Sequence, residues 1–269
     1  MIRTIAVSTG EQSYADAAEQ HALSMAKAFG ARVKAVLASD PRDIVRGERM
    51  HAGFEDPAGL AHQTMIPFLE QLRQADIAYE ECYHGEGVTD GLLSEAMESD
   101  LVVVGLPSLG RVQESHTARV TQHETLPLLR RAECSVLAVF EPPTPLRNIL
   151  VCYEGGVEGK AALRLSGHLA EKAGAKVWVF PVGNRIDRLV MLDSVAESYL
   201  GAFDLPGVGI LPEAAPTKSE SLMVEAGKET NADVIVIGSE PYGLFQRFMG
   251  EATAEALALD TTIPVLLAR

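Results

Sequence analysis

The sequence predicts an α/β protein made of two tandem, doubly wound domains, each a parallel sheet covered by helices on both faces. Two observations predict this fold class. The chain contains an ordered internal repeat, and each repeat alternates short apolar runs with helical patterns. Alternating strands and helices form parallel sheets with right-handed crossovers. The length of 269 residues also suits two domains of roughly 130 residues each better than a single large one.

The repeat consists of five short blocks that recur in the same order. Because the spacing between the two copies drifts from block to block, we infer a duplication followed by changes in loop length. The blocks of the first copy are 5–10, 30–33, 92–96, 100–105 and 135–138, and their counterparts are 150–155, 174–177, 222–226, 233–238 and 264–267.

The blocks differ in the periodicity of their apolar residues. Residues 102–104 and 234–237 are continuously β-branched, which is typical of parallel strands buried on both faces. Apolar residues at helical spacing follow the first block of each copy, and these patterns end at Gly30 and Gly174. Each copy therefore begins with a strand, a helix and a second strand.

The proline-rich segment 141–145 separates the two copies, because it cannot continue a helix or strand for long. We place the domains at residues 1–142 and 148–269. The first copy also contains a long connection, residues 40–59, rich in charges, glycine and proline. Two interpretations are open for it: a lid or partner-binding segment, or a solvated insertion.

Composition narrows the classes of function. The net charge is −14 and the basic residues are scattered, so we expect neither nucleic-acid binding nor attachment to an anionic membrane. No apolar stretch approaches the roughly 18 residues of a membrane span. The three cysteines, Cys82, Cys134 and Cys152, do not suggest a disulfide framework, and the first residues do not read as a secretory signal. We therefore expect a cytoplasmic protein.

The two ends of the second copy carry a family resemblance. Residues 149–155 read as a strand followed by an acidic residue and a glycine. Residues 233–238 read as a strand, followed by a glycine-bearing loop through Gly250, a helix over 251–259 and a final strand over 263–268. This arrangement resembles the universal stress protein family, once per repeat and over essentially the whole chain. The resemblance implies the adenine-nucleotide-hydrolase-like fold.

The resemblance also implies a nucleotide site, because nucleotide-binding members carry a loop of the form G-x2-G-x9-G-[S/T]. Such glycines let backbone N–H groups approach phosphate oxygens at a helix N-terminus. An acidic residue after the first strand helps to hold the nucleoside, and the end of the second strand offers backbone groups to adenine. In the second copy the corresponding residues are Glu154, Gly155, Val182, Gly238, Ser239, Gly243, Gly250 and Glu251.

This loop departs from the family pattern at three points. Pro241 replaces the second glycine, and the third glycine, Gly250, comes one residue early. Glu251 then stands where Ser or Thr is expected, so its charge would repel phosphate. In the first copy the loop is more degenerate, with Thr9 aligned to the acid and Gln122 and His123 where the final Gly-Ser pair belongs. We expect any bound ATP or AMP to be confined to the second domain.

No motif for catalysis or for a metal site is found. A G-x-S-x-G nucleophile elbow and a Walker-type phosphate loop are both absent. Cys82, His84 and Glu86 form a small group of potential ligands, which we interpret as an exposed strand end because zinc needs four placed ligands.

The sequence thus favours a regulatory or binding protein. A structural adaptor without nucleotide and a slow nucleotide hydrolase remain as alternatives. From the resemblance we expect the two domains to form an internal pseudo-dimer, and a homodimer of whole chains is also possible.

Overall fold

The chain divides into two compact units, residues 2–143 and 144–269, called here the N-terminal and the C-terminal unit. The structure is a computed structural model. It describes residues 2–10, 13–38, 57–85, 87–107, 127–182, 186–211, 219–239 and 261–269. Most of the long connection 40–59 and the expected helix over 251–259 lie outside these residues. None of the described helices is long and apolar enough to cross a membrane.

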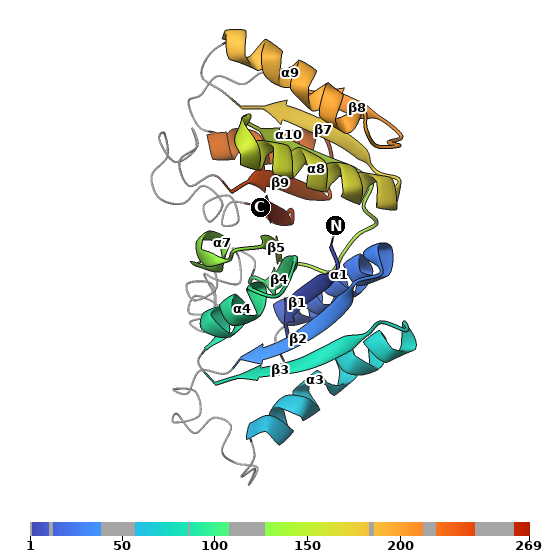
Figure 1. Cartoon of the computed structure of the whole chain (residues 1–269), viewed down its shortest axis with the longest axis vertical. Coiled ribbons are helices and arrows are strands. Elements are labelled where there is room, and N and C mark those ends of the chain that lie inside the picture. The colour runs from blue at the N-terminus through green and yellow to red at the C-terminus, as the bar shows by residue number, and fades with distance from the viewer. Residues whose placement is uncertain are drawn as a thin grey trace. The chain divides into compact units, whose positions relative to one another are not determined.

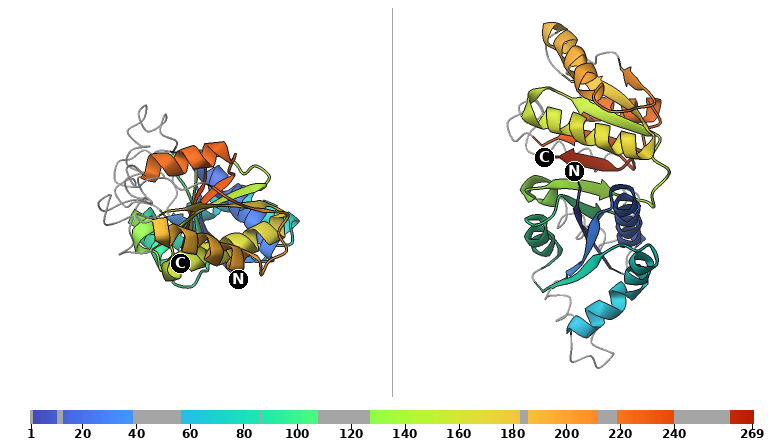
Figure 2. Two further views of the ribbon diagram at one scale, coloured as in Figure 1. Left: turned by 90° about the horizontal axis from the view of Figure 1, so that it is seen from above. Right: turned by 45° about the vertical axis from the view of Figure 1, so that its right-hand side comes forward.

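The N-terminal unit is a parallel sheet with the strand order β3-β2-β1-β4-β5 (Figure 1). In the right-hand view of Figure 2, α1 and α3 lie on one face of its strands and α4 lies on the other. The elements are β1 (Thr4–Ser8), α1 (Ser13–Phe29), β2 (Arg32–Ala38), α3 (Pro57–Gln74), β3 (Tyr79–His84), α4 (Val88–Ala96), β4 (Leu101–Gly105), α7 (Pro127–Arg131) and β5 (Ser135–Val139).

The C-terminal unit repeats this plan with the strand order β8-β7-β6-β9-β10, again with parallel pairing. Its elements are β6 (Asn148–Tyr153), α8 (Gly156–Ala173), β7 (Lys176–Pro181), α9 (Ile186–Leu200), β8 (Val208–Ile210), α10 (Ser219–Glu229), β9 (Val234–Gly238) and β10 (Val265–Ala268). In both units the first strand lies at the centre, and later strands are added on both sides of it. The predicted doubly wound α/β fold is therefore confirmed.

The cores form where the sequence predicts them. All five residues of β4 are buried, and so are the first four residues of β9, as the continuous β-branched runs indicated. The first helix of each unit ends at the predicted glycine. Gly30 and Gly174 both adopt a left-handed conformation with φ of 64°, which costs a glycine little.

One carboxylate in each unit ties the start of the first strand to the start of the fourth. In the N-terminal unit, Asp100 Oδ2 accepts hydrogen bonds from the backbone N–H groups of residues 3–4, at 2.8 and 3.0 Å. In the C-terminal unit, Asp233 Oδ2 accepts the same two bonds from residues 147–148, at 2.7 and 2.8 Å. The duplication has therefore kept this contact together with the fold.

The shared contact corrects the alignment of the first repeat block by one residue. Thr4 corresponds to Asn148, because each is the second residue held by the aspartate. The strand pairing agrees, since Thr4 pairs with Arg32 and Asn148 pairs with Lys176. The two copies are thus related by a constant offset of 144 residues from the first strand through the second.

Replacing Asp233 by alanine should lower the free energy of unfolding of the C-terminal unit by about 1–2 kcal/mol, because two charge-assisted hydrogen bonds are lost at a partly exposed position. Urea unfolding followed by circular dichroism measures this loss. The matched control is Asp204→Ala, which removes an exposed carboxylate from the same unit. Equal stability of the two variants would contradict the role given to Asp233.

Candidate functional site

The candidate site lies at the carboxyl ends of the strands of the C-terminal unit. From the central strand β6 the chain proceeds to β7 and β8 on one side, while β9 and β10 lie on the other. The strand order therefore reverses between β6 and β9, and ligands of doubly wound sheets bind at such a switch point. Glu154 and Gly155 follow β6, and Gly238 and Ser239 end or follow β9, so the fold brings these four predicted residues to this edge.

Glu154 is buried although it is acidic, with 8% of its surface exposed. It follows Tyr153 directly, and its charge, together with burial, raises the pKa of the Cys152 thiol two residues earlier. Burial has the larger effect on that thiol. A carboxylate at the end of a central strand, close to the start of a helix, is well placed to accept hydrogen bonds from ligand hydroxyl groups.

Gly155 and Gly156 form the turn from β6 into α8, with φ of 88° and 75°. Side chains rarely adopt such angles, so two glycines in succession suit this turn. The helix that follows has Gly155 as its N-cap, and no side chain caps it. A Cβ at Gly155 would also lie 3.1 Å from the Leu192 side chain of α9. The turn is therefore tight and leaves the first N–H groups of α8 without a side-chain cap.

Two of the predicted residues use their backbone N–H groups within the fold. The N–H of Val182 donates to the carbonyl oxygen of Tyr153 at 2.9 Å, and that of Ser239 donates to the carbonyl oxygen of Ala268 at 3.1 Å. Val182 could therefore meet an adenine ring through its carbonyl group rather than its N–H. Ser239 keeps its side-chain hydroxyl as a possible donor.

Gly238 has a structural explanation that the sequence did not suggest. A Cβ at this position would lie 2.8–2.9 Å from backbone atoms of Glu158 and Gly159 in the first turn of α8. Gly105 in the N-terminal unit shows the same close approach, since a Cβ there would collide with the backbone of Tyr14. The glycine at the end of the fourth strand is thus required for packing in both units, and its presence alone does not indicate a phosphate site.

The remaining predicted residues, Gly243, Gly250 and Glu251, lie outside the described residues. The structure thus describes the residues expected at the nucleoside end of the candidate site and the first residues of its loop. Expectations about the rest of the loop stay predictions.

The N-terminal unit differs at the matching positions, and here the prediction for Thr9 is wrong. With the corrected offset, Gly10 rather than Thr9 occupies the position of Glu154, so this unit has no side chain there. Thr9 is buried, and its hydroxyl donates to the carbonyl oxygen of Val36 at 3.1 Å. Thr9 therefore holds the end of β1 to β2, and among the residues described here no acidic side chain takes the position of Glu154.

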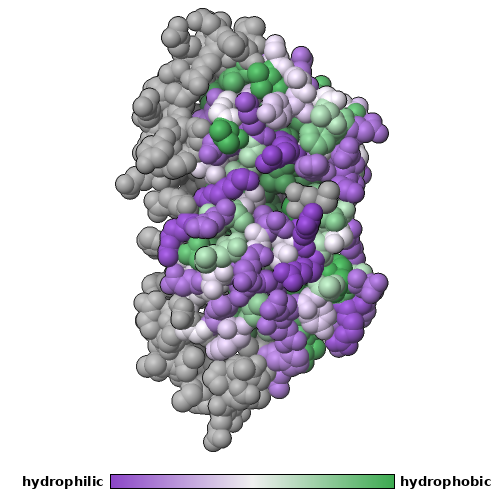
Figure 3. All heavy atoms as spheres, in the orientation of Figure 1, coloured by the Kyte–Doolittle hydropathy of each residue, from purple (hydrophilic) through white to green (hydrophobic). Residues whose placement is uncertain are grey.

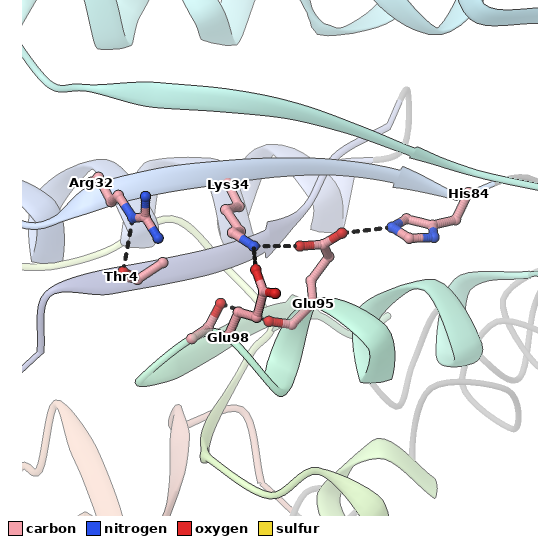
Figure 4. A network of polar contacts seen from close by, with 7 residues as sticks. Thr4, Arg32, Lys34, His84, Glu95 and Glu98 are labelled. Carbon is pink, nitrogen blue, oxygen red and sulfur yellow. Dashed lines mark hydrogen bonds and ion pairs between the residues drawn. The ribbon is translucent and has the colours of Figure 1, made fainter.

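The prediction of an exposed strand end holds for Glu80 and Glu81, which are exposed on β3, but not for Cys82. Cys82 is buried, and burial together with nearby Glu95 raises the pKa of its thiol to about 12. His84 contacts Glu95 of α4, with 2.8 Å between Nε2 and Oε1 (Figure 4). Glu86 lies outside the described residues, and among those described no group of three or more potential ligands is placed to hold a metal ion.

Glu95 is the centre of a partly buried polar network in the N-terminal unit (Figure 4). Its second oxygen accepts a hydrogen bond from Lys34 Nζ at 2.8 Å, and the same amine contacts Glu98 at 3.0 Å. Burial alone would lower the pKa of Lys34, but these two carboxylates outweigh it and raise that pKa. Burial alone would raise the pKa of Glu95, but Lys34 and His84 hold it below its usual value. The network joins α4 to both β2 and β3.

Strand order, crossovers and the position of the switch point together define a class of protein: two tandem units with the universal stress protein fold. No family model matches the sequence, and no curated protein matches it. Among solved structures, the chain resembles a universal stress protein from Archaeoglobus fulgidus with a TM-score of 0.73 and 15% identity, over 99% of this chain and 96% of that one.

The chain also resembles the solved structures of two proteins from Pseudomonas aeruginosa over almost its whole length. One, described as a candidate universal stress protein, has a TM-score of 0.68 and 17% identity, over 99% of this chain and 93% of that one. The other, of unknown function, has a TM-score of 0.58 and 16% identity, over 99% and 92%. At these identities the likeness establishes the fold, which agrees with the resemblance inferred from the sequence.

The sequence analysis did not identify Glu19, an acidic residue of α1 that contacts the backbone of Gly10, just beyond the end of β1. Glu19 is partly buried on α1, and burial, with a smaller contribution from Asp16, raises its pKa to about 8. A hydrogen bond from the backbone of Gly10 opposes the shift. The counterpart of Glu19 in α8, counted back from the glycine that ends each helix, is the fully buried Leu163. The N-terminal unit thus has an acid where its copy has a core leucine.

Because the pKa of Glu19 is higher in the folded than in the unfolded state, the folded state retains a proton that the unfolded state loses. The stability of the N-terminal unit should therefore fall as the pH rises from about 4.5 to about 8. Glu19→Leu removes this dependence. The free energy of unfolding of the variant, relative to that of the unaltered protein, should therefore rise by on the order of 2 kcal/mol between pH 5 and pH 8. Urea unfolding at several pH values measures it. A difference that is independent of pH would contradict the assignment.

Proposed function

We propose that the C-terminal unit binds an adenine nucleotide, ATP or AMP, and that the chain acts as a regulatory binding protein rather than as an enzyme. The observation that carries the proposal is the buried carboxylate of Glu154 at the switch point, beside the tight turn formed by Gly155 and Gly156. Burying an acid costs free energy unless it is compensated. Its position at the ligand-binding edge of the sheet supports a role in holding a ligand.

In this proposal Glu154 accepts hydrogen bonds from the nucleoside hydroxyl groups, and the carbonyl group of Val182 faces the adenine ring. The first turn of α8 supplies N–H groups and the positive end of a helix dipole on the phosphate side. Pro241 lacks a backbone donor, and the charge of Glu251 opposes phosphate. We therefore expect weaker affinity than an intact glycine loop would give, with the triphosphate disfavoured most.

The state of the three cysteines supports a cytoplasmic location. Cys82, Cys134 and Cys152 are all free thiols, and Cys82 and Cys152 are buried. Free thiols suit a reducing compartment. We therefore propose that the protein acts in the cytoplasm.

One set of observations favours the alternative of an adaptor without nucleotide. The glycine at the end of β9 is needed for packing, and the N–H groups of Val182 and Ser239 are used within the fold. If the unit served only as a scaffold, these features would remain, whereas a nucleotide site would also need the carboxylate of Glu154. Removing that acid therefore separates the two functions.

Isothermal titration calorimetry with AMP and ATP, with and without magnesium, tests the proposal. We expect the unaltered protein to bind, and Glu154→Ala to bind about tenfold more weakly or worse, because a hydrogen bond to a charged group is lost. Thermal unfolding of the variant shows whether the fold is intact.

The matched control is Glu229→Ala, which removes an exposed carboxylate at the end of α10. It should bind as the unaltered protein does. If no adenine nucleotide binds, or if Glu154→Ala binds as tightly as this control, the adaptor is the better account.

A further inference from the structure

The edge of the N-terminal sheet is formed by β3, which pairs with β2 on one side only. In this parallel pair Val33 lies opposite Tyr79, and the N–H of Val33 donates to the carbonyl oxygen of Ala78 at 2.9 Å. Even-numbered residues of β3 therefore direct their backbone groups toward β2. The N–H and C=O groups of Tyr79 and Glu81 point the other way, toward an edge that no described strand covers.

This edge is held from both faces of the sheet. On one face, His84 near the end of β3 contacts Glu95 of α4 at 2.8 Å (Figure 4). On the other face, His62 of α3 contacts Glu81 of β3, with 2.7 Å between Nδ1 and Oε2. A strand that is already fixed pays less ordering entropy when a further strand pairs with it.

The side chains along this edge combine aromatic and acidic groups. Tyr79 and Tyr83 share the face of Glu81, because alternate residues of a strand point to the same side. They are 36% and 37% exposed, and Ile66, one helical turn beyond His62 on α3, is 37% exposed. On the face seen in Figure 3, hydrophilic side chains predominate among the described residues and hydrophobic ones form small patches.

Acidic residues lie on the same two elements as these side chains. Glu80 and Glu81 lie on β3 itself, and Glu70 lies one turn beyond Ile66 on α3; all three are exposed. On β3 the side chain of Glu81 shares the face of the two tyrosines, and that of Glu80 is on the other face. A Lys or Arg side chain at this edge could pair with these carboxylates and stack on a tyrosine ring. The matching edge of the C-terminal unit offers less, because β8 has only three residues.

From these observations we propose that the β3 edge, defined by residues 79–83 and Ile66, is a docking site for an extended, basic segment of a partner protein. The segment adds a strand to the sheet, and its main chain bonds to the outward groups of Tyr79 and Glu81. A second copy of this chain suits the edge less well, because it would bring the same glutamates against those already there.

The test uses the whole protein and a fluorescent, end-capped peptide of alternating lysine and valine, with binding followed by anisotropy. Two variants are compared. Glu81→Ala and Glu81→Pro both lose the carboxylate and its contact with His62, but only proline removes the outward N–H. Proline is tolerated in an edge strand when the lost N–H faces away from the sheet.

We expect Glu81→Pro to bind the peptide about tenfold more weakly than Glu81→Ala, since one interstrand hydrogen bond is lost. A peptide of the same charge with a central proline should not bind. Equal binding by the two variants would overturn strand addition, leaving only a charge effect. Absence of peptide binding, or a dimer of the unaltered protein that Glu81→Pro dissociates, would overturn the choice of occupant.

Hydrogen exchange on the unaltered protein gives a second measurement that does not depend on the folding of any variant. Addition of the peptide should slow exchange at the amides of Tyr79 and Glu81. If these amides exchange at the same rate with and without bound peptide, the proposal is wrong.

Discussion

The close approach between the end of the fourth strand and the first turn of the first helix sets the geometry of each unit. At Gly238 a Cβ atom would come within 2.8–2.9 Å of the backbone of α8, and at Gly105 it would collide with the backbone of α1. Backbone atoms cannot move aside as the end of a flexible side chain can. This contact therefore fixes where the first helix begins relative to the switch point, and with it the place where any ligand of the unit would lie.

The same constraint changes how a glycine in this position is interpreted. A glycine that begins a phosphate loop and a glycine that admits a neighbouring helix look identical in sequence. Here the packing requirement is met in both units, although Glu154 has no counterpart in the N-terminal unit. In the proposed function, the difference between the units therefore rests on the residues after the first strand, and not on the glycine after the fourth.

The two units have diverged in their cores as well as at their edges. Lys34 of β2 corresponds to Trp178 of β7 by the constant offset. Lys34 is buried and paired with Glu95 and Glu98, whereas the Trp178 indole donates to Asn148 at 3.3 Å and lies beneath the Lys176 amine. One unit thus uses a partly buried ion network on this face where the other uses an aromatic ring. The network joins β3 to α4 and so supports the edge proposed as a docking site.

The fold could be predicted because local sequence patterns indicate its buried strands and the ends of its helices. Buried parallel strands show as β-branched runs, and the helices end at glycines that adopt left-handed angles. The alignment of the first strands was one residue off because short apolar runs match one another in several registers. Long-range contacts, namely the bonds of Asp100 and Asp233 and the strand pairing, fix the true register. The buried state of Glu19 and the pairing of Lys34 likewise depend on contacts between distant segments, so no spacing in the sequence indicates them.

We propose that only the C-terminal unit binds an adenine nucleotide, at the switch point of its sheet. Hydrogen–deuterium exchange of the whole protein, with and without AMP, tests it most directly because it reports on both units at once. The account predicts slower exchange at the amides that follow β6 and in the first turn of α8, with no change in the first turn of α1. Protection in the N-terminal unit, or in neither unit at saturating AMP, would contradict it.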